Sequence, residues 1–281
     1  DEAHHGLGVL LYFQRKYEEA ASHFKKSDSS FSRSFRLRCY FELGDLNRFE
    51  ELLDEIISIG KADAMVGSLI LQANDLHGWR KDNIFVDRPF DYVTQEDLGK
   101  HCNFKETFVD SSFGILNDNS VRMKDQGLLK NGRQTAGNLF SRDSPHIKMM
   151  ENVIIDGIER YRKKFTTSRS PRISHWPQEY HIHGWLVQMK EGGEIAPHIH
   201  EAGWISGAVY INVPQKLNPN EGNFVVCTHE DKSLNIGGKN TKIVDVFTGS
   251  LVLFPSSLMH YTFPFTSAEE RIVLAFEVMP R

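Results

Sequence analysis

The chain has 281 residues, of which 40% are hydrophobic and 25% are charged, a composition typical of a globular chain with one or two domains and a sizeable core. The 33 Lys and Arg residues stand against 37 Asp and Glu residues, and the resulting net charge of −4 argues against a nucleic-acid or polybasic membrane surface. No apolar run in the sequence is long enough to span a bilayer, and no signal peptide is visible at the start.

Three cysteines, Cys39, Cys102 and Cys227, lie far apart in the sequence. Their odd number and wide spacing form neither a disulfide framework nor a CxxC metal motif. This usage is typical of a reducing compartment. We therefore expect a cytoplasmic protein with no nucleic-acid partner and no membrane partner.

Residues 1–75 have the pattern of paired helices. Small and aromatic residues recur there at helical spacing, namely Gly8, Tyr12, Tyr17, Ala20 and Phe24. The pattern resembles a tetratricopeptide repeat, in which a small residue lets two helices approach closely. A second, weaker copy runs from Phe35 to Ile57, offset by about 29 residues where about 34 is usual, and a third helix covers Ala62 to Ala73. An ordinary helical hairpin packed on the following domain is the alternative.

Residues 76–170 are mixed and polar, and we expect a linker with supporting helices there. The clearest element is an amphipathic helix from Pro145 to Phe165, whose apolar residues fall on one face. Its basic end, from Arg160 to Lys164, suits a helix C-terminus.

Residues 171–281 have the pattern of short strands. The segment Tyr180–Met189 alternates with period two, and a turn is expected at Glu191–Gly193. Further strands are expected at Ile195–His200, Trp204–Val213, Asn223–His229, Thr241–Phe247, Ser250–Phe254, His260–Phe265 and Arg271–Met279. Short strands separated by Gly and Pro predict a sandwich or barrel. The predicted fold class is therefore α+β, with helical hairpins in 1–75, the mixed segment in 76–170 and a β-barrel in 171–281.

Histidines and one arginine in the barrel segment suggest a metal site. Residues i and i+2 of a strand point to the same face, so His198 and His200 can converge on one metal ion. His260, at the end of a strand and tight turn, is the natural third ligand. Arg271 opens the last strand on a face that it shares with apolar Val273. A guanidinium there needs a carboxylate partner, which an anionic ligand would supply bidentately.

The order of these residues resembles the Fe(II)- and 2-oxoglutarate-dependent oxygenase superfamily over roughly residues 176–281. It is most similar to a family whose metal strand has Pro-His-x-His followed by Ser-Gly-x-x-Tyr, which here are Pro197–His200 and Ser206–Tyr210. The resemblance implies a double-stranded β-helix (jelly roll) that uses Fe(II) as cofactor and 2-oxoglutarate as co-substrate. It also implies hydroxylation of an unidentified substrate, with release of succinate and CO2.

The same resemblance implies roles for individual residues. His198 and His260 would be metal ligands, Arg271 would bind the distal carboxylate of 2-oxoglutarate, and Tyr210 would hydrogen-bond the same molecule. The sequence departs from the superfamily's usual His-x-Asp/Glu pattern, because His200 stands where the carboxylate is expected. Three alternatives remain: His200 is a ligand, Glu201 enters through a bulge, or the protein supplies only two ligands. The same-face geometry favours His200.

Other classes of protein fit parts of the pattern. A cupin-like metal enzyme without 2-oxoglutarate would share the His-x-His segment, but Trp204 and Ile205 stand where its Glu is expected. An inactive barrel in a repeat-based scaffold is a further alternative. His181 and His183 share a strand face, and we interpret them as surface or pocket-lining residues. By analogy with repeat-bearing hydroxylases, helical repeats beside such a barrel suggest a protein or peptide substrate, and a small molecule or a sugar-bearing envelope precursor fits as well.

Overall fold

Five helices come first in the computed structural model, which describes residues 2–27, 29–60, 62–234 and 240–281. They are α1 (Glu2–Phe13), α2 (Tyr17–Ser27), α3 (Ser30–Glu42), α4 (Leu46–Ile59) and α5 (Ala64–His77). The side chains of Ser29, Asp45 and Asp63 each accept a hydrogen bond from the backbone N–H three residues on, and so cap α3, α4 and α5. The helical hairpins expected in 1–75 are confirmed, whereas their assignment as tetratricopeptide repeats stays a prediction.

Gly8 shows why the first two helices approach closely. A Cβ atom at this position would lie 2.7 Å from the ring of Phe24 in α2. A larger residue would therefore push α1 away from α2. This is the role that the sequence pattern assigned to a small residue in the first helix.

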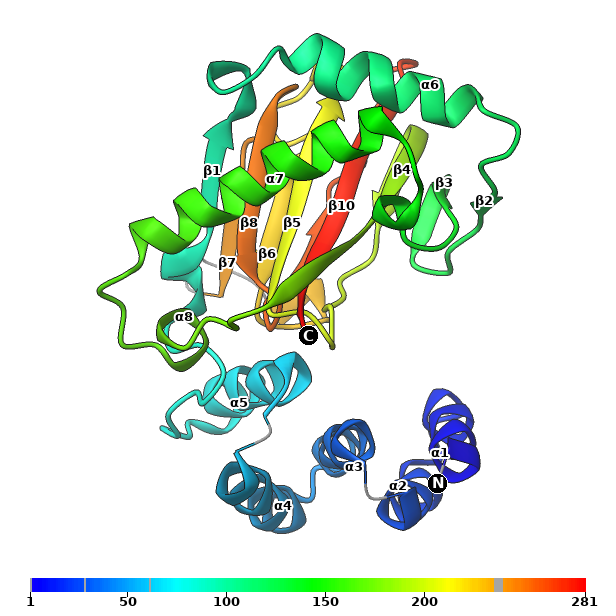
Figure 1. The fold of residues 1–281 in the computed structure, drawn as a ribbon. Helices are drawn as coiled ribbons and strands as arrows, with labels where there is room; N and C mark the ends of the chain where they lie inside the picture. The colour runs from blue at the N-terminus through cyan, green and yellow to red at the C-terminus, as the bar shows by residue number, and fades with distance from the viewer. Residues whose placement is uncertain (1, 28, 61, 235–239) are drawn as a thin grey trace.

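Two antiparallel sheets follow the helices (Figure 1). The strands are β1 (Thr94–Asp97), β2 (Met123–Lys124), β3 (Leu129–Thr135), β4 (Tyr180–Ile195), β5 (Ile205–Asn212), β6 (Phe224–Cys227), β7 (Thr241–Val244), β8 (Ser250–Pro255), β9 (Met259–Thr262) and β10 (Arg271–Pro280). The larger sheet has the order β1-β8-β5-β10-β4-β3-β2, and the smaller one has the order β7-β6-β9. Residues of both sheets, among them Tyr210 and Phe224, share one buried core. The predicted α+β fold with a jelly roll is confirmed.

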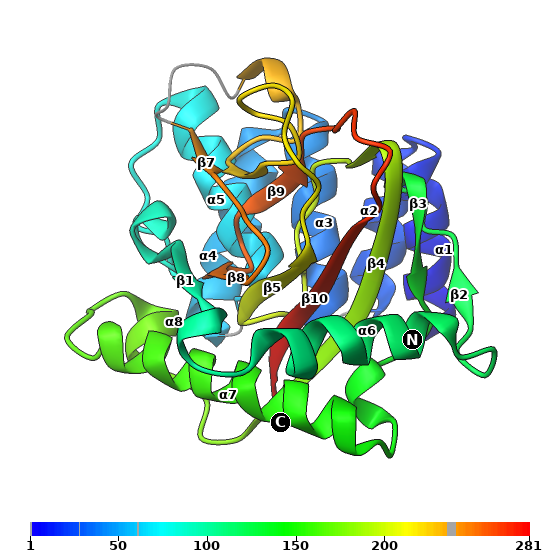
Figure 2. The same cartoon turned by 90° about the horizontal axis from the view of Figure 1, so that it is seen from above.

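The outer face of the larger sheet is covered by α7 (Pro145–Lys164) and α6 (Ser111–Asn117), which cross it in Figures 1 and 2. A short helix, α8 (Pro171–Ser174), connects α7 to β4. Helix α7 lies close to the sheet at Gly157, where the absence of a side chain allows the contact. A Cβ atom at this position would lie 2.5 Å from the side chain of Leu251 in β8. The helix expected at 145–165 is confirmed, and it ends one residue before the predicted end.

Strand β10 divides its side chains between two environments. Ile272, Leu274 and Phe276 pack into the core shared with α7. Arg271, Val273 and Ala275 alternate with them and line a pocket on the opposite face, between the two sheets. The period-two pattern of the sequence therefore decides which residues reach the interior of the barrel.

The structure differs from the sequence-based expectation at three places. Strands β1, β2 and β3 come from 76–170, so the larger sheet extends beyond the range 171–281. The turn expected at Glu191–Gly193 is wrong: β4 continues through it as a bulge, with Gly192 at φ +72°. The strand expected at Ile195–His200 is also wrong, because β4 ends at Ile195 and only His198 forms a further bridge.

The helices contact the barrel beside this bridge. Arg38 of α3 lies 3.9 Å from Glu201 and 3.3 Å from Glu230. Ile199 packs against the hydrophobic core of the helices. Across the part of the chain that the structure describes, none of the helices combines the length and the apolar character needed to span a membrane.

Candidate metal centre

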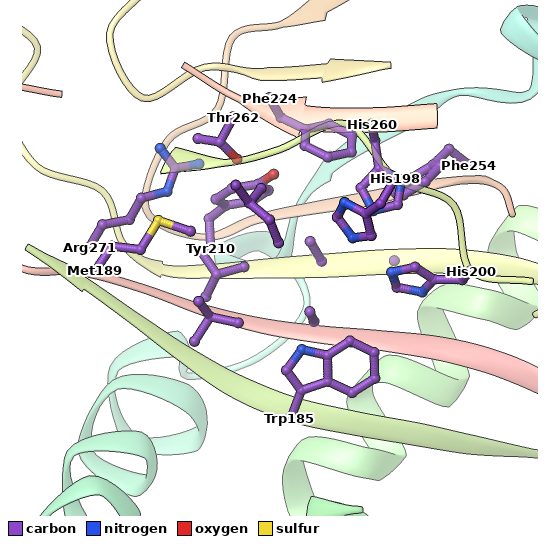
Figure 3. A pocket seen from close by; sticks show the side chains of 16 residues that line it. Trp185, Met189, His198, His200, Tyr210, Phe224, Phe254, His260, Thr262 and Arg271 are labelled. Atoms are coloured by element: carbon purple, nitrogen blue, oxygen red, sulfur yellow. The ribbon is translucent and has the colours of Figure 1, made fainter. Parts of the chain in front are cut away.

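Three histidines from two separate segments meet at one point between the sheets (Figure 3). The backbone N–H of His198 donates to the carbonyl of His260 at 3.2 Å, and the N–H of His260 donates back at 2.9 Å. This bridge fixes the two residues opposite one another, and His200 follows two residues after His198. Ring centroids are 4.1 Å apart for His198 and His260, and 4.9 Å apart for His200 and His260.

The spacing of the imidazoles suits a shared cation. One nitrogen from each ring can be chosen so that all three lie within 4.8 Å of one another. Two nitrogens bound at about 2.1 Å to one ion are at most about 4.2 Å apart. Small side-chain rotations would therefore bring His198, His200 and His260 to coordination distance. Among the described residues, these three form the one group with such geometry.

Backbone carbonyls orient two of the three rings. Nδ1 of His198 lies 2.9 Å from the carbonyl oxygen of Ala196, and Nδ1 of His260 lies 3.4 Å from that of Leu258. A ring that donates Nδ1–H to a carbonyl presents the lone pair of Nε2 to a metal. Nδ1 of His200 is buried and has no hydrogen-bond partner among the described residues.

Burial keeps the three rings in the form that binds metals. Desolvation lowers the pKa of His198 and of His260 below their usual range, and lowers the pKa of His200 to about 3. The neighbouring imidazoles lower the pKa of His260 further. Because a metal ligand must be a neutral imidazole, no proton has to leave these rings at neutral pH when an ion binds.

Glu201, the alternative ligand, lies outside this group. Its carboxylate faces Arg38 of the helices at 3.9 Å, and burial raises its pKa. A second carboxylate is closer to the histidines: Oε2 of Glu277 on β10 lies 4.0 Å from Nδ1 of His200. Burial, followed by the charge of Glu201, raises the pKa of Glu277 to about 7.

A pocket extends from the histidines to Arg271. Its wall is mostly apolar and aromatic, and Figure 3 shows the imidazoles at one end and the guanidinium at the other. Its lining includes Trp185, Val187, Met189, Tyr210, Phe224, Phe254, Thr262 and Val273. The arrangement can hold an elongated anion between a cation and a guanidinium.

Arg271 is buried, and no carboxylate pairs with it in the part of the chain that the structure describes. Its side chain is 1% exposed, its Nη1 donates to the carbonyl of Gly222, and its guanidinium carbon lies 5.2 Å from the ring centre of Tyr210. Its Nε has no hydrogen-bond partner among the described residues, and Tyr210 is the one charge interaction found for it there. Burial lowers the pKa of Arg271, but a guanidinium stays protonated in proteins. A bound carboxylate would therefore satisfy a charge that the chain leaves open.

Gly222 makes room for this guanidinium. Its φ of +64° lies in the left-handed region, and a Cβ atom there would be 2.6 Å from Nη1 of Arg271. Sequence reasoning did not identify Gly222, Thr262 or Glu277. Glu277 had a usable signal, because alternation along β10 places residue 277 on the same face as residue 271.

His181 and His183 lie on β4, where His183 is the register partner of Glu277 on β10. The ring of His183 is 5.8 Å from that of Trp185, which lines the pocket. Neither histidine forms part of a group that could bind a metal among the described residues. Their interpretation as surface or pocket-lining residues stays a prediction.

Comparisons with known proteins add a family match. Residues 183–277 match the family model described as "Putative 2OG-Fe(II) oxygenase". A search of curated proteins found no match. The matched range includes the three histidines, Tyr210 and Arg271.

Solved structures resemble the chain at low sequence identity. A prolyl-4-hydroxylase from Pseudomonas putida is 10% identical over 76% of this chain and 99% of its own, with a TM-score of 0.48. HygX from Streptomyces hygroscopicus, with nickel and 2-oxoglutarate bound, is 14% identical over 68% and 84%, with a TM-score of 0.47. A prolyl hydroxylase from Trichoplax adhaerens, in complex with a hypoxia inducible factor peptide fragment, is 8% identical over 77% and 90%, with a TM-score of 0.49.

Proposed function

We propose that the protein is a dioxygenase in which the described pocket binds Fe(II) and 2-oxoglutarate, and the match of residues 183–277 to the 2OG-Fe(II) oxygenase family model supports this proposal. One observation supports the assignment of this pocket above all others. It has three neutral imidazoles at one end, and at the other a buried guanidinium that no carboxylate of the described residues pairs with. A metal ion and a dicarboxylate together would satisfy both ends.

His198, His200 and His260 hold the iron in this proposal, each through Nε2. The bound iron supplies oxygen activation coupled to the oxidative decarboxylation of 2-oxoglutarate, which yields succinate and CO2. The carbonyls of Ala196 and Leu258 keep the rings of His198 and His260 in the correct tautomer. The three-histidine set is preferred to Glu201, since that carboxylate faces Arg38 instead.

Arg271 binds the distal carboxylate of 2-oxoglutarate. The Gly222 carbonyl engages Nη1 and so fixes the plane of the guanidinium, while Nε, which has no partner among the described residues, is able to donate to the ligand. Tyr210 packs beside the guanidinium and lines the pocket. The apolar walls, with Phe224 and Phe254, exclude water and strengthen this charge interaction.

We also propose that the reaction is a hydroxylation and that the substrate is a protein or peptide presented by the helices of residues 1–75. The contact between Arg38 of α3 and Glu201 supports this, because it places the helices directly beside the metal ligands. The three cysteines of the chain are all free, which supports a cytoplasmic location.

Binding measurements under anaerobic conditions test the function without a known substrate. We expect Fe(II), or Co(II) as a stable substitute, to raise the thermal unfolding temperature, and 2-oxoglutarate to raise it further only when the metal is present. The control ligand for 2-oxoglutarate is 2-oxopentanoate, which has the same number of carbon atoms but no distal carboxylate. Without the Arg271 contact it should bind about 10- to 150-fold more weakly, from about 1.5–3 kcal/mol for a charged hydrogen bond.

The outcomes separate the alternatives. If the metal raises the unfolding temperature but 2-oxoglutarate does not raise it further, the protein is a cupin-like enzyme. If neither the metal nor 2-oxoglutarate raises the unfolding temperature, the protein is a scaffold. Equal affinity for 2-oxoglutarate and 2-oxopentanoate would remove Arg271 from its proposed role. Succinate formed from 2-oxoglutarate by the iron-loaded protein in air would then complete the test.

A further inference from the structure

His200 differs from the other two histidines in its surroundings. The rings of His198 and His260 each have a backbone carbonyl at Nδ1, whereas Nδ1 of His200 is buried without a hydrogen-bond partner among the described residues. The side chain of His200 is only 9% exposed, so water does not replace that partner freely. A buried Nδ1–H without an acceptor destabilises the protein, so we expect His200 to gain a hydrogen-bond acceptor when its Nε2 binds the metal ion.

Glu277 is the carboxylate placed to be that acceptor. It lies on the inner face of β10, opposite His183 on β4 and Ser206 on β5. Its Oε2 is 4.0 Å from Nδ1 of His200, and its side chain is 16% exposed. The backbone of Gly203 also lies near this carboxylate: a Cβ atom at Gly203 would be 3.1 Å from Oε2 of Glu277.

The charge of the site also favours such a group. Three neutral imidazoles bring no negative charge to a divalent cation, whereas the usual His-x-Asp/Glu pattern brings one. Only the imidazole ring of His200 lies between the carboxylate of Glu277 and the expected position of the ion. Glu201 is less suited to this task, because Arg38 already faces it.

We propose that Glu277 is a positioning residue of the metal centre: it accepts Nδ1–H from His200, directs Nε2 toward the ion and supplies the negative charge that the three ligands lack. This inference rests on the proposed function. It requires the 4.0 Å separation between Glu277 and His200 to shorten by about 1 Å when the ion binds, since a hydrogen bond is about 2.7–3.2 Å long. In this proposal Glu277 on β10 supplies the carboxylate that the superfamily's usual His-x-Asp/Glu pattern places at position 200.

Two substitutions separate the acceptor from its charge. Glu277→Met keeps a similar volume but removes both, and Glu277→Gln keeps an acceptor but removes the charge. Glu269→Gln is the matched control, because it removes a carboxylate from the exposed segment just before β10. We expect Co(II) affinity, measured by competition with a chromophoric chelator, to fall about 10- to 100-fold in Glu277→Met. The Gln variant should lie between Met and the unaltered protein, and the Glu269 control should be unchanged.

Proton NMR of the Co(II)-loaded protein reports on position directly. Each ligand histidine contributes an exchangeable Nδ1–H resonance that the paramagnetic ion shifts away from the rest of the spectrum. In Glu277→Met, the resonance of His200 should be lost to solvent exchange, while those of His198 and His260, held by carbonyls, should remain. Thermal unfolding of the metal-free variants shows whether they are folded.

Each result has a defined meaning. Reduced affinity with all the histidine resonances retained would overturn the positioning role, and so would unchanged affinity in Glu277→Met. If His260→Ala abolishes metal binding while both Glu277 variants bind normally, this inference fails and the proposed function stands. If the unaltered protein binds no metal, both fail together.

Discussion

His198 and His260 are hydrogen-bonded to each other through their main chains, in both directions. The residues that carry two proposed metal ligands, from distant parts of the sequence, are therefore fixed relative to each other by backbone geometry. The ring centroids of this pair, 4.1 Å apart, are closer than those of either pair with His200. A backbone bridge of this kind preorganises two ligands and leaves the third to be set by side-chain contacts.

Replacing His260 should abolish metal retention. We expect His260→Ala to weaken Fe(II) or Co(II) binding by more than about 100-fold, because even residues behind the ligands typically contribute up to that factor. Metal content after dialysis, measured by atomic emission, checks the prediction. His175→Ala is the control, since His175 is an exposed histidine outside the pocket. Equal metal content in both variants would exclude His260 as a ligand.

Replacing Arg271 should affect 2-oxoglutarate more than the metal. Arg271→Ala is expected to weaken 2-oxoglutarate binding about 10- to 150-fold, corresponding to about 1.5–3 kcal/mol for hydrogen bonds to a charged group. Arg271→Lys should recover only part of this, because an ammonium lacks the bidentate fork. Calorimetric titrations of the Co(II)-loaded variants give both affinities. A parallel loss of metal affinity would indicate a general disturbance of the pocket.

Gly222 should be required for the arrangement of Arg271. A Cβ in Gly222→Ala would meet Nη1 at 2.6 Å, and its φ of +64° disfavours any other residue. Gly44→Ala is the matched control, because Gly44 has a similar φ of +68° but open space around it. Both variants should lose about 1–2 kcal/mol of stability from the left-handed conformation. Only Gly222→Ala should also weaken 2-oxoglutarate binding, and equal binding by the two would contradict the prediction.

The first helix offers a similar comparison. Gly8→Ala places a Cβ 2.7 Å from the ring of Phe24, whereas Gly6→Ala meets nothing within 4 Å. We expect Gly6→Ala to stabilise the protein by about 0.5–1 kcal/mol, as alanine does in an exposed helix. Gly8→Ala should instead destabilise it, by about 1–3 kcal/mol for overpacking. Urea unfolding measures both, and stabilisation by Gly8→Ala would show that α1 and α2 can separate without cost.

The sequence predicted the elements that have a strong period. Helix α7 has one apolar face at helical spacing, and β10 is a short run of apolar residues typical of a buried strand. The pairing of His198 with His200 followed from the same rule, even though their segment is not a regular strand. The two imidazoles lie close together, as predicted, although the strand on which that prediction rested is absent from this segment.

Other features depend on partners that a single sequence does not reveal. Strands β1 and β2 are short and polar, and they are strands only because β8 and β3 pair with them. The glycines at 192 and 193 have the composition of a turn, but β3 pairs with β4 on both sides of them and makes them a bulge. Glu277 was missed because its meaning depends on His200, which approaches it from another segment.

Ile199 has a consequence for how the molecule unfolds. Its two neighbours in sequence point into the barrel, while its own side chain packs against the hydrophobic core of the helices. The segment that carries two of the proposed metal ligands thus contacts both structural units. We therefore expect helices and barrel to melt in one cooperative calorimetric transition, since neither can come apart while this residue keeps its place.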